Sequence, residues 1–327
     1  MNTPLPFLPQ MLRNLIVVLS LVFAATGRGY TVNLGEWNVY YGALDDPFGR
    51  RAIISSIDAA AVVEPFDFFA IVEASGDTGD GKFEEWSGKS TALSQLSAIT
   101  TVSRHETLAL TYNAHVWVLT YNVSGDFDPG RPWLIAHFAS RSTSDAGLSL
   151  WVVTVHLPHF LDTTTSPGDI LADALATASA TTGLPTTNVI LAGDWNEFQW
   201  EDNPCPAPFY PPNCRAQAKA RMAKLWQDYF GGRARDVVTN HTLTCCTKWA
   251  VADRHTTTYK EWRFEYDHIF ATDGMHVATP ARLLPYRYPG TAAPCSDAAC
   301  TGEDPPENQT AAHQGSWHRG WSVKLAM

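Results

Sequence analysis

Basic residues are scarce in this chain: 23 Lys and Arg stand against 33 Asp and Glu among 327 residues, a formal net charge of -10. Domains that hold long nucleic acids through their phosphates usually present a basic surface. The acidic balance therefore argues against a broad phosphate-binding surface. It still allows a site that handles one phosphate, because a metal ion can neutralise a phosphate locally. If the substrate is a long nucleic acid, we expect weak and salt-sensitive binding.

Several motifs that would define an active site are absent. No Cys-x-x-Cys pair occurs, which leaves a structural zinc site with little support. No His-Glu-x-x-His or Gly-x-Ser-x-Gly sequence occurs, which excludes a zinc protease of that type and a serine hydrolase with that elbow. Residues 76–82 nearly spell a nucleotide-binding loop, but Phe83 follows where that motif needs a hydroxyl for Mg²⁺. We interpret this segment as a loop.

Long apolar runs are absent too, with one short exception near the start. Residues 15–25 are almost wholly apolar and follow Arg13, and small residues occupy positions 25–27. A helix needs ~20 apolar residues to span a bilayer, so the run fits a cleaved secretory signal better than a membrane anchor. We predict a signal peptide over residues 1–29 and one secreted domain over residues 30–327, with no transmembrane segment.

Six cysteines fit a secreted chain, because disulfides persist in oxidising compartments. Cys205 and Cys214 frame a proline-rich loop, and Cys295 and Cys300 frame a short one, but the sequence does not choose among the pairings. Three sequons would accept glycans in a eukaryotic secretory pathway: Asn122, Asn240 and Asn308. We predict a disulfide-bonded glycoprotein and expect it to be a monomer.

Helical and strand-like segments alternate along the mature chain. Helical spacing of apolar residues predicts helices over residues 47–63, from Ser166-Pro167 to Gly183, and over about 215–230 before two glycines. Buried apolar runs lie between them. This alternation predicts an α/β protein with two sheets and helices outside.

Polar residues stand at or near the ends of these strand-like runs. Asp194 and Asn196 come directly after the apolar run 189–192, which predicts a strand buried on both faces. A carboxylate beside a carboxamide suits phosphate chemistry, because one can bind a metal ion or water while the other holds an oxygen; an ordinary Asx turn is the alternative. Similar residues stand at or near the ends of other strand-like segments: Asn38, Glu73 and His156 at the ends of three runs, Asp267 on a late strand, and His318 just before the final strand.

This ordered set resembles the endonuclease/exonuclease/phosphatase superfamily, over about residues 31–325. Its members include secreted deoxyribonucleases, abasic-site endonucleases, neutral sphingomyelinases and inositol-polyphosphate 5-phosphatases. The resemblance implies a four-layer α/β/β/α sandwich of two mixed β-sheets flanked by helices. It also implies a metal-dependent phosphodiesterase that uses Mg²⁺, with Mn²⁺ or Ca²⁺ as substitutes.

The same resemblance implies roles for the residues at the strand ends. Glu73, aided by Asn38, would bind the metal ion. His318 would act as general base or electrostatic partner, held by Asp267 through an Asp–His hydrogen bond. His156 would donate to a phosphoryl oxygen or to the leaving group. A satisfied buried imidazole is the alternative for each histidine.

Three further positions complete the expected site. Asp194 and Asn196 would orient the nucleophile and the scissile phosphate, and Tyr112 matches a Tyr or Arg position of the superfamily. One residue departs from the pattern: Trp317 stands before His318 where the superfamily usually has Asp beside the metal. Its loss predicts weakened or altered metal use, and a catalytically weakened binding protein is an alternative. We expect strand alternation to turn Glu36 away from the site, so that it cannot compensate.

The substrate is the least determined part of the prediction. A secreted, disulfide-bonded member of the superfamily resembles its deoxyribonuclease branch most. We therefore predict a deoxyribonuclease-like endonuclease that acts on nucleic acid. Twelve tryptophans and the aromatic pair Phe209-Tyr210 in the proline-rich insertion suit contact with lipid as well. A sphingomyelinase-like phosphodiesterase acting on phospholipid head groups is therefore the alternative.

Overall fold

The computed structural model describes residues 30–76, 82–103, 106–128, 130–142, 147–158, 166–196, 214–238, 266–285, 318 and 320–327. The predicted signal peptide, the loop at 77–81, Trp317 and the side chains of all six cysteines lie outside the described residues, as do Asn240 and Asn308. Asn122 is described, and it is exposed on a strand. Within the part described, no helix combines the length and apolar character needed to cross a bilayer.

One mixed sheet contains six strands in the order β11-β12-β1-β2-β4-β3. Its only parallel pair is β1 with β2 among the described strands; the other neighbours are antiparallel. The strands are β1 (Thr31–Asn38), β2 (Phe68–Gly76), β3 (Ser97–Val102), β4 (Glu106–Tyr112), β11 (His276–Leu283) and β12 (Trp321–Ala326).

The second mixed sheet has the order β5-β6-β7-β8-β10-β9, with β7 and β8 parallel. Its strands are β5 (Trp117–Phe127), β6 (Arg131–Ser140), β7 (Ser149–His156), β8 (Val189–Asp194), β9 (Ala234–Asp236) and β10 (Asp267–Thr272). Every residue of β8 is buried, which confirms the predicted strand covered on both faces.

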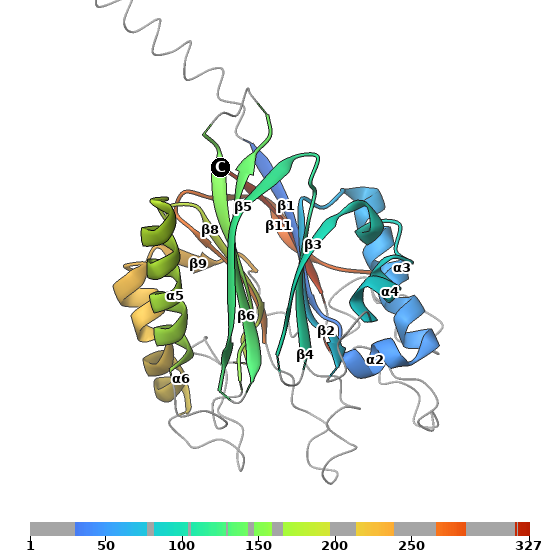
Figure 1. The fold of residues 1–327 in the computed structure, drawn as a ribbon, viewed down its shortest axis with the longest axis horizontal. Coiled ribbons are helices and arrows are strands. Elements are labelled where there is room, and N and C mark those ends of the chain that lie inside the picture. The colour runs from blue at the N-terminus through green and yellow to red at the C-terminus, as the bar shows by residue number, and fades with distance from the viewer. Residues whose placement is uncertain are drawn as a thin grey trace, which may run out of the picture.

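The two sheets pack face to face, and helices cover their outer faces (Figure 1). The core between the sheets takes apolar side chains from both, for example Leu34 and Phe68 from one and Phe138 and Ile190 from the other. The first sheet is covered by α2 (Tyr41–Asp45), α3 (Pro47–Val63) and α4 (Lys82–Ser87), with a short 3-10 turn at Leu93–Gln95. The second is covered by α5 (Pro167–Thr182), α6 (Cys214–Ala223) and a π-helical turn, Lys224–Tyr229. The predicted four-layer sandwich is confirmed.

Local capping explains why the two long helices were predictable. In α3, the Asp46 side chain accepts from the backbone N–H of Phe48, and Pro47 occupies the first turn. In α5, Ser166 caps the start and Gly183 ends the helix at φ 69°. The third predicted helix is present with one correction: from Lys224 onward it continues as a π-helical turn.

Strand alternation in β1 corrects the expectation for Glu36. Leu34 faces the core between the sheets, and every second residue shares its face, so Glu36 and Asn38 point the same way. Trp37 packs on the opposite, helix-covered side. Glu36 is wholly buried, with a relative exposure of 0%. The period of two therefore turns Glu36 toward the site instead of away from it.

Candidate active site

The strand ends of the two sheets meet at one edge of the sandwich. In the second sheet, His156 and Asp267 both lie opposite Asp194, so β7, β8 and β10 bring three polar side chains into one row. In the first sheet, Asn38 lies opposite Val72, the residue before Glu73. This register explains how residues far apart in sequence become neighbours.

A β-bulge places Glu73 in the cluster. The pairing of β2 with β4 shifts register between Ile71 and Ser75, and Glu73 has a φ of 54°. Positive φ is rare for a residue with a Cβ, and such strained positions often occur at functional sites. Glu73 was expected at the end of its strand, but it lies inside β2 at the bulge.

Asp194 lies at the centre of the cluster. Its Oδ2 accepts a hydrogen bond of 2.8 Å from Nδ2 of Asn38, which also donates to Oε1 of Glu73 over 3.2 Å. The Nε2 atoms of His156 and His318 lie 3.4 Å and 3.7 Å from the same Oδ2. Asn38 therefore joins the two sheets as a donor between carboxylates, and its Oδ1 accepts from the backbone N–H of Tyr40.

Each histidine has its own carboxylate on the far side of the ring. Nδ1 of His318 lies 2.8 Å from Oδ2 of Asp267, as the sequence predicted. Nδ1 of His156 lies 2.5 Å from Oε1 of Glu106. A carboxylate at Nδ1 fixes the orientation of an imidazole and leaves Nε2 for proton transfer. The site thus contains two carboxylate–imidazole pairs whose Nε2 atoms converge on Asp194.

Sequence reasoning missed Glu106 and Arg131. Nη1 of Arg131 donates to Oε2 of Glu106 over 3.1 Å, lies 3.7 Å from Oε1 of Glu73, and contacts both ring nitrogens of His156. Burial alone would lower the pKa of Arg131, but Glu106 and Glu73 raise it above its ordinary value. Glu106 opens the buried strand β4 and Arg131 opens β6, so a charged residue beside a buried run was the available signal.

Asn196 reaches the site edge through an Asx turn. Its backbone N–H donates to Oδ1 of Asp194 over 3.0 Å, and its Nδ2 donates to the carbonyl of Leu157 over 2.9 Å. The preceding Gly193 has a φ of 145°, and a Cβ there would lie 2.0 Å from the carbonyl oxygen of Val155. Glycine is therefore required for β8 to deliver Asp194 and Asn196 together. Asp194 therefore forms the Asx turn that was the alternative interpretation of the sequence, and it also lies within the polar cluster.

Tyr112 does not join the cluster, and its expected place in the site is corrected. It ends β4 opposite Phe68, at the start of β2, whereas Glu106 lies opposite Gly76 at the other end of the pair. Tyr112 and Glu106 therefore lie at opposite ends of β4, and only the Glu106 end is near the cluster. Its ring packs against Phe138, with centroids 4.9 Å apart.

The charges of the cluster shift its acidities. Burial lowers the pKa of His318, but the carboxylates of Asp267 and Asp194 outweigh it and raise this pKa to about 9. Burial raises the pKa of Asp194 to about 7, with Asp267 adding to the rise and His318 opposing it. Burial and the charges of Asp267 and Asp194 raise the pKa of Glu36 well above its ordinary range.

The Asp267–His318 pair yields a direct prediction. In Asp267→Asn, the pKa of His318 should fall from about 9 toward the ordinary value of ~6.5, because the largest charge that stabilises the imidazolium is removed. Titration of the His318 ring signals by NMR, in EDTA, measures the shift. An unchanged pKa would show that Asp267 does not set the protonation of His318.

The donor set fits a hard divalent cation. Glu73, Glu106 and His156 form one group whose potential ligand atoms lie within 4.8 Å of one another, and Asp194, Asp267 and His318 form a second. Carboxylate oxygens with few other ligands are what Mg²⁺ prefers, since it keeps several waters and substrate oxygens. The buried carboxyl group of Glu36, which has no hydrogen-bond donor among the described residues, is influenced by Asp267 and Asp194 of the second group. Buried acidic and histidine groups here could therefore hold a metal ion.

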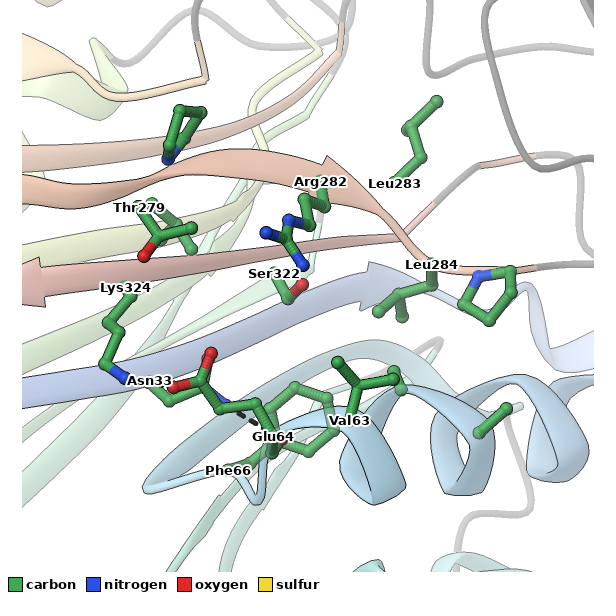
Figure 2. A pocket seen from close by; sticks show the side chains of 15 residues that line it. Asn33, Val63, Glu64, Phe66, Thr279, Arg282, Leu283, Leu284, Ser322 and Lys324 are labelled. Atoms are coloured by element: carbon green, nitrogen blue, oxygen red, sulfur yellow. Dashed lines mark hydrogen bonds and ion pairs between the residues drawn. The ribbon is translucent and has the colours of Figure 1, made fainter.

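A separate pocket of about 150 Å³ lies outside this cluster, between the end of α3 and strands β11 and β12 (Figure 2). Val63, Glu64 and Phe66 line one side, and Arg282 and Lys324 the other. Nζ of Lys324 pairs with Oε1 of Glu64. Among the described residues that line it there is no histidine and no member of the cluster, so we assign the pocket no part in the chemistry.

Solved structures share this fold. An endonuclease/exonuclease/phosphatase family protein from Bacteroides thetaiotaomicron is similar at a TM-score of 0.55 and 14% identity, over 92% of this chain and 99% of that chain. TDP2 from D. rerio, complexed with a single-strand DNA product, is similar at a TM-score of 0.53 and 13% identity, over 91% of this chain and 99% of that chain. ANGEL2, a 2',3'-cyclic phosphatase in complex with adenosine-2',3'-vanadate, is similar at a TM-score of 0.55 and 14% identity, over 91% of this chain and 96% of that chain.

Sequence comparison adds nothing to this: no family model and no curated protein matches the chain. The likeness is one of fold, and it confirms the predicted resemblance at that level. The chain has the α/β sandwich fold of endonuclease/exonuclease/phosphatase proteins. Proteins that share this fold include some that act on phosphoester bonds.

Proposed function

We propose that this protein is a secreted, Mg²⁺-dependent phosphodiesterase, and that its substrate is nucleic acid, cleaved as by a deoxyribonuclease-like endonuclease. One observation carries the proposal: two carboxylate–imidazole pairs present their Nε2 atoms to Asp194 from two sides, at 3.4 Å and 3.7 Å. Hydrolysis of a phosphodiester needs one group to take a proton from water and another to give one to the leaving oxygen.

The residues divide this work between them. His318, oriented by Asp267, would take the proton of the attacking water, and Asp194 would orient that water beside it. His156, oriented by Glu106, would give a proton at Nε2 to the leaving oxygen. Arg131 would bind a non-bridging phosphoryl oxygen, because its guanidinium lies next to His156.

Glu73 and Asp194, linked by Asn38, would hold the cation. When bound, Mg²⁺ supplies charge stabilisation on the phosphoryl oxygens and lowers the pKa of nearby groups. That effect matters for His318, because a pKa of about 9 leaves the ring protonated at neutral pH. A cation beside Asp194 would oppose the imidazolium charge and so favour the basic form.

The substrate class is tested by offering both candidates. The mature protein should nick plasmid DNA in Mg²⁺ and lose this activity in EDTA, with product formation followed on gels. Sphingomyelin is assayed in parallel for choline phosphate release, because a net charge of -10 argues against a broad surface for long nucleic acid. Choline phosphate release without nicking would favour the lipid substrate. Inertness on both would favour the binding protein and overturn the proposed activity.

Secretion is part of the same proposal, supported by the apolar run at residues 15–25 and by the accessible sequon at Asn122. Expressed in a eukaryotic cell line, the chain should accumulate in the medium with its first ~25–29 residues removed. Glycosidase treatment should increase the gel mobility of the wild type more than that of Asn122→Gln. Mass spectrometry of the amino terminus checks the cleavage, and an intracellular chain that keeps residues 1–29 would contradict the proposal.

A further inference from the structure

Glu36 lies buried beneath the described cluster, where no role has been assigned to it. Its side chain has 0% exposure. It follows Leu34 and precedes Asn38 on the face of β1 that looks between the sheets, and Asn38 hydrogen-bonds both Glu73 and Asp194. The side chain is therefore directed to the interior just below the site.

The surroundings of Glu36 do not balance its charge. Among the residues that the structure describes, no hydrogen-bond donor reaches either carboxylate oxygen. The charged groups that act on it are Asp267 and Asp194, which are also acidic. The other carboxylates here have partners: Asp194 has Asn38, Asp267 has His318, and Glu106 has Arg131. Burial of a carboxylate without a donor or a countercharge is strongly unfavourable.

We propose that Glu36 is an additional carboxylate that strengthens the divalent-cation site electrostatically from the interior, next to the group of Asp194, Asp267 and His318 whose atoms could hold the ion directly. A hard cation such as Mg²⁺ would supply the positive charge that the surroundings of Glu36 lack. The inference rests on the proposed function, because it concerns the same metal site, and it adds a residue whose part in that site nothing else indicates.

The position of Glu36 also fits the unusual carboxyl-terminal sequence. Trp317 precedes His318 where the superfamily usually carries Asp beside the metal. Strand β1 pairs with β12, the strand that follows His318, and Glu36 lies opposite Trp321. With a cation bound, Glu36 would supply a negative charge to the site from the neighbouring strand.

Calorimetric titration of Mg²⁺ into the mature protein tests this role without measuring activity. Glu36→Gln keeps the shape of the side chain and removes its charge, and it should weaken Mg²⁺ binding by at least ~10-fold. Glu36→Asp keeps the charge and should bind more tightly than Glu36→Gln. Asp67→Asn is the matched control, because Asp67 accepts from the N–H of Asn33 and from Trp117 before β2 begins, at the other end of that strand from Glu73. Its binding should equal that of the wild type.

Thermal unfolding provides the second measurement. In EDTA, Glu36→Gln should melt at or above the temperature of the wild type, because Gln keeps the shape of the side chain and no hydrogen bond to a described residue is lost. Mg²⁺ should raise the melting temperature of the wild type more than that of the variant. A variant that unfolds earlier in EDTA would overturn the proposal, since it would show that the carboxylate serves the packing of the fold.

The titration also separates this inference from the proposed function. If Glu73→Gln loses Mg²⁺ binding while Glu36→Gln binds like the wild type, the metal site stands and the role of Glu36 is overturned. If the wild type itself binds no Mg²⁺, the proposed metal dependence fails, and the role of Glu36 fails with it. Weakened binding in both variants, with normal binding in Asp67→Asn, supports both.

Discussion

Replacing Glu73 by Gln is expected to abolish Mg²⁺-dependent turnover and leave the fold intact. The carboxylate projects from a bulge with φ 54°, accepts from Asn38 over 3.2 Å and lies 3.7 Å from Arg131. Gln keeps the size of the side chain and an oxygen for Asn38, but it removes the negative charge that we propose holds a cation. A loss of at least ~10³-fold in kcat/KM is expected when both metal binding and charge stabilisation are impaired.

Kinetics over a range of Mg²⁺ concentrations measure this effect, with circular dichroism to establish equal folding. Glu85→Gln is the matched control, since Glu85 is an exposed residue of α4 that pairs with Arg50 and Lys89. That variant should retain full activity. Undiminished activity in Glu73→Gln would remove Glu73 from the site.

Replacing either histidine of the two pairs by Ala should lower turnover by at least ~10²-fold, the usual scale for an acid–base group. His156 and His318 both approach Oδ2 of Asp194, so under the proposed mechanism each loss would remove one of the two proton transfers. The double variant should lose less than the product of the two single effects, because the two groups act on one reaction. The pH profiles of kcat/KM should lose one limb in each single variant.

A third buried histidine provides the control for these substitutions. His137 lies in β6, six residues along the strand from Arg131. Its side chain has 2% exposure and contacts Thr120 and Trp151. His137→Gln should retain wild-type activity. If His318→Ala also behaves like the wild type, the assignment at the carboxyl terminus is wrong, and His313 in the sequence becomes the candidate.

The layers of the fold were predictable because their signals are local. The helix α3 matches the predicted residues 47–63, and α5 begins after its Ser166 cap and ends at Gly183 as expected. Apolar runs at β7 and β8 likewise indicated buried strands. The π-helical turn after α6 was not predicted, because its apolar spacing still resembles that of an α-helix.

The candidate site was predictable only where a polar residue stood at or near one end of a strand-like run. Asn38, His156, Asp194, Asp267 and His318 were found in this way, and the structure brings them together with Glu73. Glu106 and Arg131 reach the site through antiparallel pairing, whose direction and register single-sequence periodicity does not reveal. Tyr112 was wrongly expected in the site because the direction of β4 was not known. Glu36 was wrongly expected to point away because it was compared with Trp37 instead of with Asn38, two residues along the strand.

The central claim is that Glu73 and its neighbours hydrolyse a phosphodiester with the help of Mg²⁺. Hydrolysis of bis(p-nitrophenyl) phosphate tests it most directly, because this small diester makes no demand on nucleic-acid or lipid recognition. The mature wild-type protein should release p-nitrophenolate in Mg²⁺, with no release in EDTA and none by Glu73→Gln. Equal release in Mg²⁺ and EDTA, or no release by a folded protein with Mg²⁺ bound, would contradict it.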